Sequence, residues 1–147
     1  MKVFAENRRA RFDYRILETT EAGIELKGHE VKAVKTGHIS LGGSFIVIKN
    51  NQAWLVNADV PPYQPANTPA GYDSKRTRRL LLSAAQIKTL TGRIKEKGLT
   101  LMPLRVYNKG RLLKVEIGIA KGRRQIDKRE TIKEREWSRL RRRIETR

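Results

Sequence analysis

The sequence predicts a mainly β protein, an antiparallel barrel or open sheet with flanking helices, followed by a basic C-terminal tail. Three observations support this fold class. Three pairs of β-rich runs are each interrupted by residues typical of tight turns, at 20–23, 50–51 and 108–111. The one long helical pattern occurs late in the chain, after residue 83. No stretch shows the alternation of strands and helices that forms a parallel sheet.

The first third of the chain predicts a hairpin between two short helical segments. Residues 4–13 (FAENRRARFD) are expected to form a basic helix or an ordered arm. From Tyr14 apolar and polar residues alternate, and the segment ending at Gly23 separates two such runs, which predicts a turn at 20–23. Val31 and Val34 have helical spacing, so residues 29–35 are expected to form a short helix closed by Gly37.

The middle of the chain predicts a second hairpin and a long loop. Residues 44–48 (SFIVI) and 53–57 (AWLVN) flank the turn signal Asn50-Asn51, and Trp54 is expected to pack in the core. The stretch 60–79 is rich in proline and ends in a basic run. A loop of this length in a small domain is usually functional or disordered.

The C-terminal half predicts one helix and a third hairpin. Ser83 and Gln86 have the spacing of a capping box, and three apolar residues at 87, 90 and 94 share one helical face, which Gly98 would end. Residues 99–107 and 112–120 flank the turn at 108–111. Such short antiparallel strands suit a small Greek-key barrel of the oligonucleotide-binding type.

Charge distinguishes two regions. The chain has 33 Lys and Arg against 15 Asp and Glu, a net charge of +18, of which residues 121–147 carry +7 and residues 1–120 carry +11. Apolar residues after 122 form too thin a stripe to anchor a helix on a domain. We therefore expect a barrel domain at 1–122 and a tail at 123–147 that is disordered alone and helical when bound to an anionic partner.

Such a charge points to a polyanionic partner, with nucleic acid first and an anionic membrane surface second. The chain contains no Cys, which excludes a disulfide framework and a thiolate metal site. It shows neither the apolar run of a signal peptide nor a membrane span, so a cytoplasmic location is expected.

The sequence offers no catalytic constellation, so we expect neither enzyme activity, nor a cofactor, nor a metal site. The two histidines, His29 and His38, lack the further ligands that zinc requires. Gly37, Gly42 and Gly43 precede no Gly-Lys-Ser/Thr, which excludes a phosphate-binding loop of that type. Most carboxylates are interleaved with Lys or Arg and resemble solvated ion pairs.

Basic clusters and two single residues are the candidate binding groups. Clusters occur at 8–11, 75–79 and 121–124, and they either converge on one face or are scattered as a solubilising surface. Glu21 is either a polar turn residue or an acceptor for base amino groups and the ribose 2′-OH. Trp137 has little apolar surface near it in the tail, so it either anchors a partner or docks back onto the barrel.

Several segments together resemble the small protein B family of SsrA-binding proteins. The resemblance runs from about Asn7 to the C-terminus. It rests on NRRARFDY (7–14), ETTEAGIELKGHEVKAVKTG (18–37), RTRRLLL (76–82), GRIKEKGLTLMPLRVY (92–107) and KVEIGIAKGRRQIDKRETIKEREW (114–137).

The resemblance implies an oligonucleotide-binding-type barrel that binds the transfer-RNA-like domain of transfer-messenger RNA. It also implies delivery of that RNA to ribosomes stalled on messenger RNA without a stop codon, the reaction sequence called trans-translation. The tail would enter the vacant messenger channel near the decoding centre and fold into a helix there. The partners are then this RNA and the ribosome, and the protein is expected to be a monomer.

The resemblance also assigns residues. The family's RNA-binding glutamate, barrel leucine and last-strand lysine fall on Glu21, Leu81 and Lys114, and its decoding triplet falls on Asp127, Lys128 and Arg129. The full set predicted to bind RNA is Glu21, Leu81, Lys114, Arg8, Arg9, Arg11, Lys32, Arg76, Arg78, Lys121, Arg123 and Arg124. The residues predicted to contact the ribosome are Asp127, Lys128, Arg129 and Trp137.

The chain departs from the family pattern at Ile126, where some members carry a histidine able to stack on RNA. The C-terminal SRLRRRIETR is also unusually rich in arginine. Two other functions remain open from the residues alone: a ribosomal protein or assembly factor with a barrel and a basic tail, and an RNA-processing nuclease.

Overall fold

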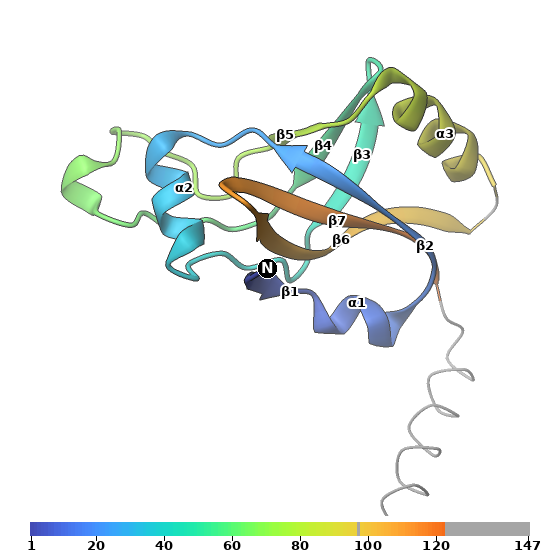
Figure 1. The fold of residues 1–147 in the computed structure, drawn as a ribbon, viewed down its shortest axis with the longest axis horizontal. Coiled ribbons are helices and arrows are strands. Elements are labelled where there is room, and N and C mark those ends of the chain that lie inside the picture. The colour runs from blue at the N-terminus through green and yellow to red at the C-terminus, as the bar shows by residue number, and fades with distance from the viewer. Residues whose placement is uncertain (97, 123–147) are drawn as a thin grey trace, which may run out of the picture.

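The computed structural model describes residues 1–96 and 98–122, which form an antiparallel barrel surrounded by helices (Figure 1). In these residues the strands are β1 (Val3–Glu6), β2 (Tyr14–Ile24), β3 (Phe45–Lys49), β4 (Gln52–Val56), β5 (Arg78–Leu81), β6 (Leu99–Lys109) and β7 (Leu112–Gly122). The helices are α1 (Arg8–Asp13), α2 (Gly28–Lys35), α3 (Ala84–Ile94) and the 3-10 turn η1 (Pro65–Asn67). The predicted fold class, mainly antiparallel β with flanking helices, is confirmed.

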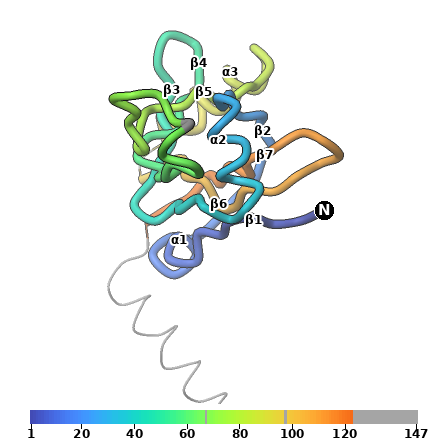
Figure 2. Tube along the Cα trace, turned by 90° about the vertical axis from the view of Figure 1, so that its left-hand side faces the viewer, coloured from blue at the N-terminus to red at the C-terminus, as the bar shows by residue number. Residues whose placement is uncertain are grey.

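The sheet closes on itself through its longest strands. Its order is β1-β6-β3-β4-β5-β2-β7, and β7 also pairs with β6. β2, β6 and β7 have eleven residues each and form one continuous wall, while β3 joins β6 through Ile46 opposite Leu101. Helix α2 and η1 lie at one end of the barrel and α3 at the other (Figure 1). The β6–β7 turn projects from the barrel (Figure 2).

The predicted hairpin at 20–23 is wrong, because β2 is one unbroken strand from Tyr14 to Ile24. It pairs with β7 along this length, with a bulge between Ile16 and Glu18. Gly23 is not a turn residue. A Cβ built there would lie 3.2 Å from the Cβ of Leu81 on β5, so glycine permits the close approach of these two strands.

The N-terminal segment forms a strand before its helix. Residues Val3–Glu6 pair with β6, and α1 starts only after Asn7. The Asn7 side chain accepts a hydrogen bond from the Ala10 N–H (3.2 Å) and donates one to the Pro103 carbonyl (3.0 Å). This residue therefore caps α1 and also fixes the helix to β6. The expectation of one helix or arm over 4–13 missed the strand.

The other two predicted hairpins are confirmed. Asn50 and Asn51 both have positive φ, 54° and 57°, as a two-residue turn between β3 and β4 requires. Trp54 does not lie in the core, however. It occupies the outer face of β4 between the buried Ala53 and Leu55, and its Nε1 donates to the Lys49 carbonyl (3.3 Å).

Helix α3 begins as its sequence predicts. The Gln86 N–H donates to the Ser83 hydroxyl (3.2 Å), and the Ser83 N–H donates to the Gln86 side chain (2.9 Å), which is a capping box. Leu90 is buried against the barrel core. None of the helices within residues 1–96 and 98–122 is long and apolar enough to cross a membrane.

A buried ion-pair network anchors α2 to β5. Glu30 on α2 and Arg78 on β5 are both fully buried, and Arg78 Nε and Nη2 donate to Glu30 Oε2 at 2.9 and 2.6 Å. Arg76 pairs with the same carboxylate through Nε (3.1 Å) and Nη2. The Lys27 N–H also donates to Glu30 (2.9 Å), so this one carboxylate caps its own helix as well.

The same network orders the loop 60–77. The Tyr72 hydroxyl bonds to Glu30 (2.9 Å) and to the Val60 carbonyl (2.8 Å), while the Arg78 guanidinium donates to the Ala58 and Ser74 carbonyls (2.8 and 2.9 Å). Hydrogen bonds to Tyr72 and Arg78 therefore hold the loop in place near both of its ends.

Prediction: replacing the Glu30 carboxylate unfolds this end of the barrel. Burial alone would raise the pKa of the Glu30 carboxyl, but hydrogen bonds from Arg76, the Lys27 backbone and Arg78 outweigh it and lower the pKa to about 2. Glu30→Gln leaves two arginines without a counter-charge, and we expect it to lower the free energy of unfolding by about 3–5 kcal/mol at pH 7.

Urea denaturation of both proteins measures this loss. Because the folded-state pKa is lowered, the stabilisation is fully present above about pH 4.5 and declines as the pH falls towards 2. The difference in the free energy of unfolding between the wild type and Glu30→Gln should therefore become smaller as the pH falls from about 4.5 towards 2. The exposed Glu25→Gln is the matched control and should change stability little. A pH-independent gap would contradict the assignment.

Candidate nucleic-acid interface

Glu21 lies on the outer face of the long wall, held by two neighbours on β6. The Tyr107 hydroxyl donates to Glu21 Oε2, and Lys109 Nζ lies 3.4 Å from Oε1. The hydrogen bond from Tyr107 lowers the pKa of the Glu21 carboxyl; burial opposes this, while Lys109 and Lys114 add to it by attraction. Glu21 is thus a fixed, ionised acceptor on an otherwise basic surface.

Tyr107 shows the reverse effect. Burial, and then its hydrogen bond to the Glu21 carboxylate, raises the pKa of the Tyr107 hydroxyl to about 12. The hydroxyl therefore keeps its proton and remains a donor to Glu21. Two acceptor positions on the carboxylate stay available for an incoming N–H or O–H group.

The three residues carried over from the family pattern surround one glycine. Gly23 on β2 is opposite Leu81 on β5 and opposite Lys114 on β7. Lys114 is in turn opposite Tyr107 on β6, the residue that holds Glu21. The structure thus brings together side chains that are 60 and 33 positions apart in the sequence.

A cavity of about 320 Å³ lies at this meeting point. It is lined by Gly23, Ile24, Leu26, Val31, Leu81, Arg111, Leu112, Leu113 and Lys114. Leu81 and Leu112 are 47% and 62% exposed, which is unusual for leucine unless a partner covers them. The arrangement offers an apolar surface for a base or sugar, cations for phosphate, and one carboxylate for amino or hydroxyl groups.

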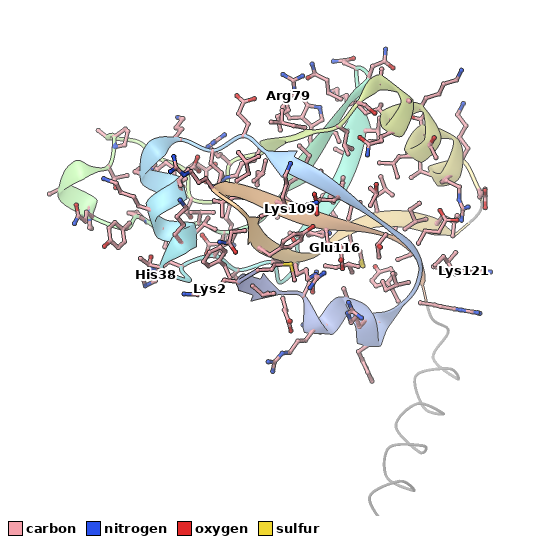
Figure 3. The ribbon with its side chains drawn as sticks, in the orientation of Figure 1. Lys2, His38, Arg79, Lys109, Glu116 and Lys121 are labelled. Atoms are coloured by element: carbon pink, nitrogen blue, oxygen red, sulfur yellow. The ribbon has the colours of Figure 1, made fainter. Side chains whose placement is uncertain are left out.

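A second charged cluster continues the same face towards α1. Arg105 on β6 donates to Glu116 on β7 through Nε (3.1 Å) and Nη2 (3.0 Å), and its guanidinium lies 4.9 Å from the centre of the Tyr107 ring. Arg11 on α1 approaches Glu116 at 3.9 Å. Figure 3 marks Glu116 and Lys109 on this face, whereas Arg79 lies on the β5 side.

Sequence reasoning missed Tyr107, Lys109 and Arg105. The sequence predicts a strand over 99–107, but it does not show that this strand lies within reach of Glu21 on β2. Strand order decides that pairing, and residues 86 and 88 positions apart cannot be matched by spacing alone.

The remaining predicted RNA-binding residues occupy different surroundings. Arg8 and Arg9 on α1 are almost fully exposed and only loosely paired with Glu6 (4.0 Å) and Asp13 (3.6 Å). Lys32 is exposed on α2. Lys121 is exposed at the end of β7, opposite Arg15. Arg123, Arg124, Asp127, Lys128, Arg129 and Trp137 lie outside the described residues.

The basic run 75–79 does not act as one cluster, and the expectation for Arg78 is wrong. Its side chain is completely buried, and its donors bind Glu30, Tyr72 and backbone carbonyls. It therefore has no surface left for RNA. Arg76 is partly exposed, but Glu30 holds it as well. The sequence gives no local sign that Arg78, the first residue of β5, is buried, because its partner Glu30 lies 48 positions earlier.

Neither histidine takes part in a metal cluster. In the described part of the chain, no three His, Asp or Glu side chains are grouped so that they could hold a metal ion. His29 stacks edge-on against Tyr72 (4.7 Å between ring centres), and His38 bonds to the Thr36 hydroxyl (2.8 Å).

Comparison with known proteins gives consistent results. The family model described as SmpB protein matches residues 4–147. The chain is 50% identical over 140 residues to the SsrA-binding protein of Coprothermobacter proteolyticus, covering 95% of this chain and 93% of the relative. It is 52% identical over 134 residues to that of Chlorobaculum tepidum, covering 90% and 85%.

A solved structure agrees with the fold. The chain is similar to one described as "tmRNA-SmpB: a journey to the center of the bacterial ribosome", with a TM-score of 0.68 and 42% identity over 87% of this chain and 93% of the other. The barrel type and the family resemblance expected from the sequence are confirmed. From the family match over almost its whole length, we conclude that the chain belongs to the SmpB family of SsrA-binding proteins.

Proposed function

We propose that this protein binds transfer-messenger RNA through its barrel and accompanies it to stalled ribosomes for trans-translation. The observation that carries the proposal is the convergence of Glu21, Leu81 and Lys114 around Gly23, on one basic face of the barrel. The relatives' description as SsrA-binding proteins and the ribosome complex of the structural neighbour support it. The SmpB family is not a known enzyme family, and we assign the protein a binding role only.

The binding mode follows from the three kinds of group on this face. Lys114 and Arg111 neutralise phosphates, which supplies affinity but little selectivity. Leu81 and Leu112 give an apolar surface against which a base or sugar packs. Glu21 accepts hydrogen bonds from amino groups or the 2′-OH and repels phosphate, so it fixes which part of the nucleotide lies beside it.

The barrel domain at 1–122 and the tail at 123–147 are proposed to bind different RNAs. The tail's Asp127, Lys128, Arg129 and Trp137 are assigned to the ribosome, with the tail ordering as a helix only in the vacant messenger channel. Its net positive charge suits a channel lined by phosphates. The protein is proposed to act as a monomer, since one barrel face supplies all three RNA-binding groups.

Prediction: Glu21→Ala and Lys114→Ala weaken binding to a transfer-messenger RNA transcript without unfolding the barrel. We expect each to raise the Kd by about 5- to 100-fold, as the loss of one charge-assisted contact implies. Lys114→Ala should also lower the slope of log K against log salt by about 0.7 to 0.9. Fluorescence anisotropy at several salt concentrations measures both effects.

The matched controls are Glu96→Ala and Lys88→Ala, which make the same charge changes on or beside α3, at the opposite end of the barrel from α2 (Figure 1). They should bind like the wild type. Thermal unfolding must show intact folding for Glu21→Ala and Lys114→Ala. If Glu21→Ala unfolds the protein, Glu21 has a structural role, and its assignment as an RNA contact is contradicted.

Prediction: deleting residues 127–147 abolishes activity on stalled ribosomes but leaves binding to transfer-messenger RNA intact. The truncated protein should bind the transcript within about threefold of the full chain, because the barrel residues remain. It should fail to support peptide tagging on ribosomes stalled at the end of a messenger RNA in a reconstituted translation system. Loss of transcript binding by the truncation would contradict the two-region assignment.

A further inference from the structure

A second cavity, of about 380 Å³, lies on the other side of α2 from the first. It is lined by Gly28, His29, Lys32, Tyr63, Gln64 and Pro69, which come from α2 and from the loop that carries η1. Helix α2 separates the two cavities: Val31 lines the first and Lys32 the second. A bound polymer that leaves the first cavity therefore has only this one helix to cross.

The outer wall of the second cavity is held in place before any ligand arrives. The Thr68 hydroxyl and the Gln64 carbonyl form a hydrogen bond of 2.9 Å, and the Val60 N–H donates to the Ser74 carbonyl (2.9 Å). Tyr72 ties the returning part of the loop to Glu30 on α2. Little ordering is thus required on binding, which favours affinity.

The lining carries an aromatic ring and a cation, the two kinds of group that bind a single-stranded nucleotide through its base and its phosphate. Tyr63 is 39% exposed, and its ring, which lies 6.4 Å from the His38 ring at a tilt of 45°, offers an aromatic face. The Lys32 ammonium is exposed at the rim and forms no ion pair with any residue among 1–96 and 98–122. His29 packs edge-on against Tyr72 (4.7 Å between ring centres), and its buried Nε2 has no hydrogen-bond partner within the same residues, so this residue belongs to the inner lining of the cavity.

Charge selects the class of ligand. No carboxylate lines the cavity, and the nearby Glu30 is neutralised by two arginines. Exposed lysines at positions 27, 35 and 75 surround α2 and the loop. These features favour a polyanion that carries a planar, weakly polar unit beside each charge over an acidic peptide, whose charged Asp and Glu side chains carry no such unit.

We propose that this cavity takes one unstacked base of the same RNA that the first cavity binds. The base stacks on Tyr63, and Lys32 neutralises the adjoining phosphate. The RNA strand crosses α2 between the two cavities. The inference rests on the proposed function and extends it from one contact region to two.

Tyr63→Ala tests the stacking contact. With a fluorescent full-length transfer-messenger RNA transcript as probe, its Kd should rise by about 5- to 100-fold, the range for loss of one base–aromatic stack. Tyr63→Phe keeps the ring and should bind within about threefold of the wild type. The matched control is Phe45→Ala, because Phe45 is a similarly exposed ring (41%) on β3, outside both cavities.

Lys32→Ala tests the phosphate contact independently. It should lower the slope of log K against log salt by about 0.7 to 0.9, whereas Tyr63→Ala should leave that slope unchanged. Thermal unfolding checks the fold of each variant. Tyr63→Leu, which keeps apolar volume without the aromatic face, should show the same loss of binding as Tyr63→Ala.

The outcomes distinguish this inference from the proposed function. If Glu21→Ala weakens binding but Tyr63→Ala and Tyr63→Leu bind like the wild type, the second cavity is not an RNA site and the first still is. If the wild-type protein does not bind the transcript, both are wrong. A Tyr63→Ala protein that binds the transcript normally but fails only on ribosomes would also overturn the inference, in favour of a ribosomal component.

Discussion

The buried pairing of Glu30 with Arg76 and Arg78 is the interaction on which the arrangement of both cavities depends. A closed barrel needs no helix at this end, and α2 exposes many polar groups. One carboxylate nevertheless joins α2, β5 and the returning loop, because Arg78 reaches it from the strand and Tyr72 from the loop. Since burying these charges is costly, the network stabilises only while it is complete. A complete network fixes the position of α2, whose residues line both cavities.

The close contact between β2 and β5 has a comparable role in the first cavity. Any side chain at position 23 would push against Leu81, whose own position makes it a wall of that cavity. The bulge at Ile16 and Glu18 increases the local twist of β2, as bulges do. Glu21 then lies beside Tyr107 and Lys109 of β6, although β7 runs between the two strands.

The sequence predicted the elements whose local chemistry is unambiguous. Asn50-Asn51 and the Ser83–Gln86 pair are local signals, and both occur as expected. The sequence-based predictions were wrong where contacts with residues distant in the sequence determine the conformation or burial of a residue. The local pattern predicts a turn at Gly23, because the close approach of a strand 58 positions later has no local signature. The local pattern likewise predicts an exposed Arg78, because its partner Glu30 is distant in the sequence. The grouping of Glu21, Leu81 and Lys114 came from the family resemblance, since spacing alone cannot place three strands side by side.

In the binding mode that we propose, the carboxylates on this basic surface supply the selectivity of a protein of net charge +18. Lysines and arginines attract any polyanion, so they cannot by themselves decide which part of a nucleotide lies where. Glu21 and Glu116 are each held by cations or a donor from β6, which keeps them in fixed positions. Because the pKa of the Glu21 carboxyl is lowered, the carboxylate is charged at neutral pH, and in the proposed binding mode it repels phosphate from its side of the face. The proposed binding mode therefore places the phosphates towards Lys114 and Arg111 and the base or the 2′-OH towards Glu21.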